Sequence, residues 1–259
     1  MGAYFRSRKQ GRTGDEVRRM PVHGFTIIEV MLFFAVTGAL MLGVLGTASI
    51  GVNTQRYNDA VNTFVSIVQQ EFTNVTNVVN SNSDTSVCAS ASNVNRGISD
   101  CVILGRLMTI DSNGDMVRSN IVSTTTPTTP PATNTRELAV VRGYNPRIDT
   151  SSQEDGQMNW GTRILRGSNG SNVALLIIRS PRSGNVYSYV VHSSVGIPTD
   201  VSDLIDDIIG GAADNSRDQY MCIDRSGWVA SSMRVVKLTP YASGPGGVNV
   251  EDESGSVCG

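Results

Sequence analysis

The sequence is poor in histidine, with His23 and His192 as the only two in 259 residues. So few imidazoles argue against a histidine-rich metal site. A Ser-His-Asp arrangement would depend on His192 alone, and no nucleophile-elbow motif lies near it. The sequence also lacks a phosphate-binding glycine loop and the ligand spacing of a zinc site. We therefore expect no enzyme activity, no cofactor and no metal ion.

One acidic segment has to be weighed against that expectation. Asp111, Asn113 and Asp115 have the alternate spacing that opens a calcium loop. An EF-hand fails here, because the glycine is misplaced and the twelfth position is Val122. A polar hairpin turn explains the same residues. A looser calcium site is the alternative.

Charge is missing altogether from Val30 to Val52, a run long enough to cross a bilayer as a helix. The 24 residues before Phe25 carry only Asp15 and Glu16 as acids, whereas their basic residues are Arg6, Arg8, Lys9, Arg12, Arg18 and Arg19. Positive charge stays on the cytoplasmic side of a membrane anchor. We therefore expect residues 1–24 in the cytoplasm and the chain beyond Val52 outside the cytoplasmic membrane.

Between these two segments stands Gly24-Phe25-Thr26-Ile27-Ile28-Glu29. A basic leader, this hexapeptide with its single glutamate, and an unbroken apolar helix together resemble the class III signal of type IV pilins and pseudopilins. The leader is longer than in many relatives. An ordinary signal anchor is the alternative. A secretory signal peptide fits poorly, because cleavage here would precede the apolar run.

The resemblance implies a role for each of three residues. A prepilin peptidase would cut after Gly24, and Phe25 would become the N-methylated first residue. The Glu29 carboxylate would neutralise the N-terminal amine of a neighbouring subunit in the filament core. A carboxylate in hydrocarbon is costly alone and much less so when it is paired with an ammonium group, which is consistent with that role.

Four cysteines, Cys88, Cys101, Cys222 and Cys258, all follow the apolar run. An even number in an oxidising compartment predicts two disulfides, and four cysteines allow three pairings. We favour 88–101 and 222–258, because each pair flanks a local segment and the second would hold the C-terminal tail. Free buried thiols are the alternative.

The apolar run continues into an amphipathic stretch. Apolar residues three and four apart predict one face of a helix, at Tyr57, Val61, Phe64, Val68, Phe72, Val75 and Val79. We expect a single helix from Phe25 to Asn80, apolar all round over residues 25–52 and amphipathic over 53–80. The glycines at 38, 43, 46 and 51 indicate close helix packing; a stretch able to lose helicity in a filament is the alternative.

Residues 81–259 are predicted to form a β-rich head. We expect strands at 101–110, 116–122, 137–144, 173–178, 186–192, 220–224 and 228–238, and a short helix at 203–209. Residues 145–171 read as an irregular loop, and the Thr- and Pro-rich residues 123–133 as an extended, solvated one, where O-glycosylation is an option. The predicted fold class is α+β, with a long N-terminal helix packed on an antiparallel sheet.

A group of arginines could contact nucleic acid, namely Arg163, Arg166, Arg179 and Arg182. The whole chain has 21 basic and 23 acidic residues, of which the leader takes six and two, so residues 25–259 carry a net charge of −6. That charge gives no long-range attraction to DNA. A solvated surface is the favoured interpretation, and we do not expect a nucleic-acid partner.

These features predict a structural subunit of a type IV pilus-like filament. The size of the processed chain, 235 residues, favours a minor pilin over the main subunit. The expected partners are other pilin subunits, the prepilin peptidase and methyltransferase, an inner-membrane assembly platform, and lipid before assembly. The alternatives are a pseudopilin of a secretion or competence system, and a membrane-anchored adhesin or binding protein that never assembles. The sequence does not reveal a ligand for the head.

Overall fold

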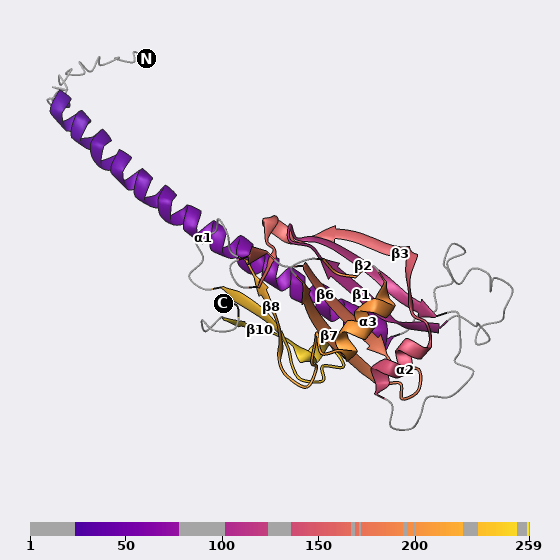
Figure 1. Cartoon of the computed structure of the whole chain (residues 1–259). Helices are drawn as coiled ribbons and strands as arrows, with labels where there is room; N and C mark the ends of the chain where they lie inside the picture. Colours follow the sequence, from indigo (N-terminus) through magenta and orange to yellow (C-terminus); the bar gives the residue numbers. More distant parts are fainter. Residues whose placement is uncertain are drawn as a thin grey trace, which may run out of the picture. The chain divides into compact units, whose positions relative to one another are not determined.

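The structure is a computed structural model that describes residues 24–77, 102–123, 136–166, 169–170, 172–193, 196–198, 200–224, 233–252 and 258. The chain divides into two compact units, Met1–Thr47 and Ala48–Gly259. The long helix α1, Ile27–Thr76, begins in the first unit and ends in the second. Figure 1 shows α1 together with the strands and short helices of the second unit, which we call the head.

The head contains two antiparallel sheets rather than the single sheet expected. Sheet A has the strand order β3-β2-β1-β6-β7, and sheet B has the order β10-β9-β8-β4-β5. The strands of sheet A are β1 Val102–Ile110, β2 Asp115–Ser123, β3 Arg147–Gln157, β6 Asn172–Arg179 and β7 Val186–Ser193. Those of sheet B are β4 Ile164–Arg166, β5 Asn169–Gly170, β8 Gln219–Ile223, β9 Arg234–Leu238 and β10 Val248–Asp252. The predicted α+β class, a long helix on antiparallel strands, is confirmed.

Two hydrophobic cores cover the two faces of sheet A. In the first, the buried face of α1 packs against apolar side chains from both sheets, among them Leu175 of β6 and Val236 of β9. In the second, the opposite face of sheet A is covered by α2, Glu137–Gly143, and α3, Val201–Ile209. These two helices lie against each other and are joined by an Arg142–Asp206 ion pair of 3.0 Å.

Strand alternation divides β1 and β6 between these cores. Met108 and Leu175 face α1, whereas Leu107 and Leu176 face α2 and α3. The pairing of β1 with β2 shifts register between Ile103 and Gly105, and the backbone of β6 lies close to Gly105 on the other side. A Cβ atom at Gly105 would lie 2.1 Å from the carbonyl oxygen of Ile177, so this position requires glycine. The core strands therefore have apolar residues on both faces.

The helix and hairpin predictions are mostly confirmed. α1 covers most of the expected range, and β1 and β2 flank the expected turn at residues 111–115. β6 pairs with β7, and α3 contains the short helix predicted at 203–209. β8 pairs with β9, which is described from Arg234 to Leu238. Residues 78–80, 124–133 and 225–232 of the predicted elements lie outside the described residues.

Two predictions for residues 137–171 are wrong. Residues 137–144 do not form a strand, because Leu138 and Val141, three apart, both enter the core that α2 covers, as one face of a helix does. Residues 145–171 are not simply a loop, since they contain β3, β4, β5 and the 3₁₀ turn η2, Asn159–Gly161. β3 is polar and largely exposed, and its backbone ladder to β2 makes it an edge strand of sheet A.

Candidate assembly helix and its attachment to the head

The helix α1 begins with a capping arrangement at the predicted signal. The Thr26 side-chain oxygen accepts from the backbone N–H of Glu29 (3.3 Å), and the Thr26 carbonyl accepts from the N–H of Val30 (3.2 Å). Thr26 is thus the N-cap and Glu29 the third helical residue, which is the Thr-x-x-Glu pattern of a capping box. Our reading of the sequence missed this role of Thr26, although the spacing alone would have indicated it.

Glu29 therefore has a local structural role besides the one that the resemblance implies. It lies in the first turn of α1, where a negative charge is favoured by the helix dipole by about 0.3–1 kcal/mol. The side chain is exposed. Its expected role in pairing with a neighbouring subunit stays a prediction, and the effect of the charge on the helix dipole has to be separated from it by experiment.

Gly24 and Phe25 precede the helix, and no contact with the described residues fixes their identity. A Cβ atom added at Gly24 meets no atom of the described chain within 4 Å, so the fold gives no reason for a glycine there. The side chain of Phe25 is 79% exposed. Both residues lie open to another molecule, and their predicted processing stays a prediction.

The first half of α1 exposes its apolar side chains on every face. From Phe25 to Val52 the exposed fractions of the large apolar side chains run from 41% for Val30 to 79% for Phe25. In the described part of the chain, α1 is the one helix long and apolar enough to cross a membrane. The hydroxyl of Thr37 donates to the carbonyl of Phe33 (2.8 Å), and Thr47 does the same to Gly43 (3.2 Å), so these polar groups are satisfied within the helix.

The second half of α1 attaches the head through the predicted stripe. Every described member of that stripe is buried, with exposed fractions of 2% or less at Tyr57, Val61, Phe64, Val68, Phe72 and Val75. These residues belong to the core that both sheets share. Burial of α1 by the head begins at Tyr57. The apolar side chains of α1 therefore change from exposed to buried within one or two turns after Val52.

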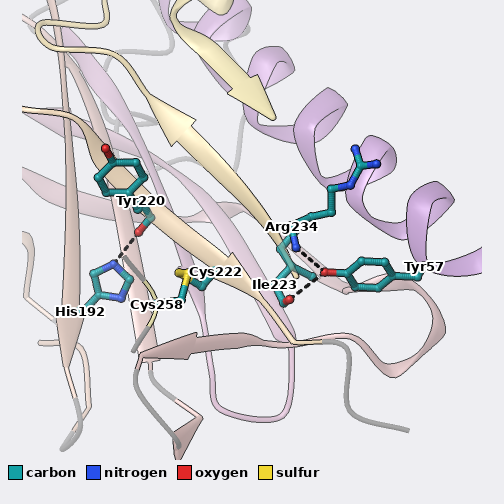
Figure 2. Close-up of a disulfide and its surroundings, with 7 residues drawn as sticks. All are labelled: Tyr57, His192, Tyr220, Cys222, Ile223, Arg234 and Cys258. Atoms are coloured by element: carbon teal, nitrogen blue, oxygen red, sulfur yellow. Dashed lines mark hydrogen bonds between the residues drawn. A yellow bond between two sulfur atoms is a disulfide. The ribbon is translucent and has the colours of Figure 1, made fainter. Parts of the chain in front are cut away.

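Tyr57 also forms hydrogen bonds to sheet B, at the end of β8 and β9 where Ile223 pairs with Arg234. Its hydroxyl donates to the carbonyl oxygen of Ile223 in β8 (3.0 Å) and accepts from the backbone N–H of Arg234 in β9 (2.9 Å), as Figure 2 shows. Ile223 and Arg234 form the last described pair of the β8–β9 ladder. The helix thereby fixes the strand ends as well as packing on them.

A buried ion-pair cluster joins α1 to sheet A. Glu71, only 1% exposed, bonds to Arg106 Nε of β1, and its second carboxylate oxygen lies 3.5 Å from Arg118 Nη1 of β2. Glu154 of β3 closes the cluster from the solvent side, 3.0 Å from Arg118 Nη2. Burial raises the pKa of Glu71 above its usual range, and the charges of Arg106 and Arg118 partly offset this.

Sequence reasoning missed this cluster, although one signal was available. Glu71 follows Val68 by three residues and precedes Val75 by four, which places it on the same helix face as the apolar stripe. Charged residues are seldom buried unless they are paired. A carboxylate on a buried face therefore calls for basic partners in the strands opposite, and Arg106 and Arg118 are these partners.

The C-terminal tail is joined to sheet B by a disulfide between Cys222 and Cys258 (Figure 2), with Cα atoms 5.9 Å apart. This is the second of the two pairs we expected. Cys88 and Cys101 lie outside the described residues. Next to the disulfide, the imidazole of His192 in β7 donates from Nε2 to the carbonyl oxygen of Tyr220 in β8 (2.9 Å), which connects the edge of sheet A to sheet B.

The remaining candidate residues lie in structural contacts. The Asp111 side chain accepts from the backbone N–H groups of Asn113 and Asp115, both at 2.8 Å, as in a hairpin turn. No cluster of three or more potential metal ligands occurs among the described residues.

The predicted arginine group is not one free basic patch in the described part of the chain. Arg163 pairs with Asp224 (2.7 Å), and Arg182 pairs with Glu137 (2.9 Å). Arg179 donates to the carbonyl of Gly184 in the β6–β7 turn (3.2 Å). The side chain of Arg166 lies outside the described residues.

Comparisons of this chain with protein-family models, with curated proteins and with solved structures find no match. The function is therefore argued from the residues and their geometry alone.

Proposed function

We propose that this protein is a structural subunit of a type IV pilus-like filament, made as a membrane-anchored precursor and assembled through the first half of α1. Peptidase cleavage after Gly24 creates the new N-terminus at Phe25, and Glu29 pairs with that amine in a neighbouring subunit. A minor subunit remains the favoured assignment because of the size of the processed chain.

The observation that carries the proposal is the division of α1 into two halves. A simple membrane anchor needs a span of about 20 residues and then a linker. Here the same helix continues for several turns beyond the span and is built into the core of the head. The span and the head are thus parts of one continuous helix with no linker between them, which suits a repeating assembly.

The glycine at 24 supports the processing step. Because the fold gives no reason for a glycine there, a requirement outside this chain is the simpler explanation, and a peptidase subsite is one. Gly24→Val should accumulate unprocessed protein, because a branched side chain blocks the subsite, while Gly38→Val in the apolar half should be processed normally. Normal processing of Gly24→Val would count decisively against the signal.

Mass spectrometry of the native N-terminus tests the proposal directly. A chain that starts at N-methylated Phe25 supports the pilin pathway, whereas one that starts at Met1 makes the protein a simple anchor. The amount of the protein in sheared surface filaments then separates a main subunit from a minor one. A processed chain absent from surface filaments favours the pseudopilin of a secretion or competence system.

A further inference from the structure

Trp160 occupies a position that the stability of the head does not explain. It lies in the 3₁₀ turn η2 with φ +59° and ψ +25°, a left-handed backbone conformation that is rare for a bulky residue. Such a conformation costs on the order of 1–3 kcal/mol. The indole is also 51% exposed, so half of its surface gains nothing from burial. An exposed tryptophan in a strained turn points to a role in binding.

The indole stacks on the helix where the span ends. The Arg56 guanidinium lies 4.8 Å from the centroid of the Trp160 ring, a cation–π contact. Arg56 follows Val52 by one helical turn and immediately precedes Tyr57, the first residue that the head buries. Among the described residues Arg56 makes no ion pair, so its donors remain open to an anionic group.

Helix geometry gives the level of this pair relative to a bilayer. The uncharged run of 23 residues from Val30 to Val52 spans about 34 Å at the helical rise, close to the roughly 30 Å of a hydrocarbon core. Arg56 stands about 6 Å farther along the axis, which is within the headgroup layer. Tryptophan is enriched in that layer, and arginine reaches lipid phosphates from it.

We propose that Trp160 and Arg56 form an interfacial anchor that holds the head on the lipid headgroups while the subunit waits in the membrane. The ring lies among the ester groups of the lipid, and the guanidinium binds a lipid phosphate. The anchor would fix the orientation of the head on the membrane surface before incorporation. This inference rests only on the insertion of α1 in a bilayer, which is one part of the proposed function, and not on filament assembly.

The test measures the depth of Trp160 in phosphatidylcholine–phosphatidylglycerol vesicles. In the full chain carrying Trp228→Phe, Trp160 is the only tryptophan. We expect lipids brominated near the ester end of the chain to quench its emission strongly, and lipids brominated near the chain terminus to quench it less. The same protein in detergent micelles without brominated lipid provides the reference intensity.

A second variant tests two points: whether Trp160 strains the backbone of the head, and whether its partner is another subunit and not lipid. Trp160→Asn, a residue that tolerates the left-handed region, should leave the thermal midpoint unchanged or raise it, because the head loses strain and no core contact. A large fall in the midpoint would mean that Trp160 serves stability and would overturn the proposal. Unquenched emission from vesicles together with reduced filament content in Trp160→Asn would assign Trp160 to a contact between subunits instead.

The results of these experiments distinguish failure of the anchor proposal from failure of the filament proposal. Vesicle flotation first establishes that the chain is inserted, and a chain that does not float overturns the anchor together with the membrane part of the proposed function. Floating protein without quenching overturns the anchor alone. Quenching in a protein that forms no filaments would leave the anchor in place while the assembly proposal fails.

Discussion

At the scale of single residues, Tyr57 is the contact at which the helix holds the strand ends of sheet B. Tyr57→Phe keeps the buried ring and removes both hydrogen bonds, so that the Ile223 carbonyl and the Arg234 N–H lose this partner. Leaving such buried groups unpaired costs about 1–3 kcal/mol. We expect a loss of that size in the free energy of unfolding, measured by urea denaturation of the full chain in detergent.

The matched control for this change is Tyr220→Phe. The Tyr220 hydroxyl makes a single exposed contact of 3.3 Å with Asp218, so its removal should change the free energy of unfolding by no more than about 0.5 kcal/mol. If the two variants were equally stable, the Tyr57 hydroxyl would have no structural role at the strand ends.

Glu71 should make stability depend on pH in a defined direction. Because burial raises its pKa in the folded chain above the unfolded value of 4.5, the native state binds this proton more tightly than the unfolded state. Its contribution to the free energy of unfolding is therefore complete below pH 4.5 and falls as the pH rises through the folded pKa. The physical cause is the cost of placing a charged carboxylate in the core, which Arg106 and Arg118 only partly offset.

Glu71→Gln isolates this contribution, since glutamine resembles the protonated acid and does not titrate. The free energy of unfolding of the wild type minus that of the variant should decrease as the pH rises from 4 to neutrality, as measured by urea denaturation at each pH. A difference that increases with pH would mean that the arginines dominate and that the folded pKa is lowered.

At the scale of secondary-structure elements, the two halves of α1 should respond in opposite ways to the loss of a large side chain. Phe72 is fully buried in the core shared by both sheets. Phe72→Ala should lower the free energy of unfolding by about 3–5 kcal/mol through a cavity. Leu45, which is 67% exposed, should tolerate Leu45→Ala in detergent within about 0.5 kcal/mol.

Filament content is a second measurement that compares Phe72→Ala with Leu45→Ala. If the apolar half of α1 serves packing between subunits, Leu45→Ala should reduce filament content while it leaves thermal unfolding in detergent unchanged. Equal loss of stability in both variants would contradict the division of α1 into an assembly half and a head half.

The elements also show where sequence reasoning succeeds and where it does not. The stripe from Tyr57 to Val75 was predictable because a helix with one buried face leaves a period of three and four residues. β3 was not, because an exposed edge strand is held by its backbone ladder and leaves no apolar alternation in the sequence. Residues 137–143 are too short for their period to separate a helix from a strand, and the core contacts of Leu138 and Val141 decide between them.

The candidate site divides in the same way. The apolar helix could be predicted from residue type and charge alone, whereas the processing signal from Gly24 to Glu29 stays a prediction. Glu71 could be suspected from its place on the stripe, but its partners Arg106 and Arg118 come from strands 35 and 47 residues away. Trp160 depends on a backbone angle and on its contact with Arg56, neither of which a single sequence encodes in a readable pattern.

At the scale of the whole molecule, the exposed half of α1 requires an apolar environment on every side, and a membrane and a bundle of like helices both provide one. In the proposed assembly, the passage from the membrane to the helix bundle would expose Glu29 to a new environment. In a filament core a carboxylate needs a cationic partner, and breaking such a pair costs about 3 kcal/mol or more, which is roughly a hundredfold in an equilibrium constant. We expect Glu29→Ala to be processed and inserted normally and to be strongly depleted from filaments.

Glu29→Gln separates this charge from the shape of the side chain, because the Glu29 group that bonds to Thr26 is the backbone N–H and is kept in every variant. Glutamine serves at the third position of a capping box as glutamate does, so the start of α1 is preserved, but the negative charge is gone. If the carboxylate pairs with the amine of a neighbour, Glu29→Gln should assemble as poorly as Glu29→Ala, and Glu29→Asp should assemble better than both. Filament content equal to the wild type in Glu29→Gln would mean that assembly does not need the negative charge, and wild-type content in Glu29→Ala would remove the side chain from assembly altogether.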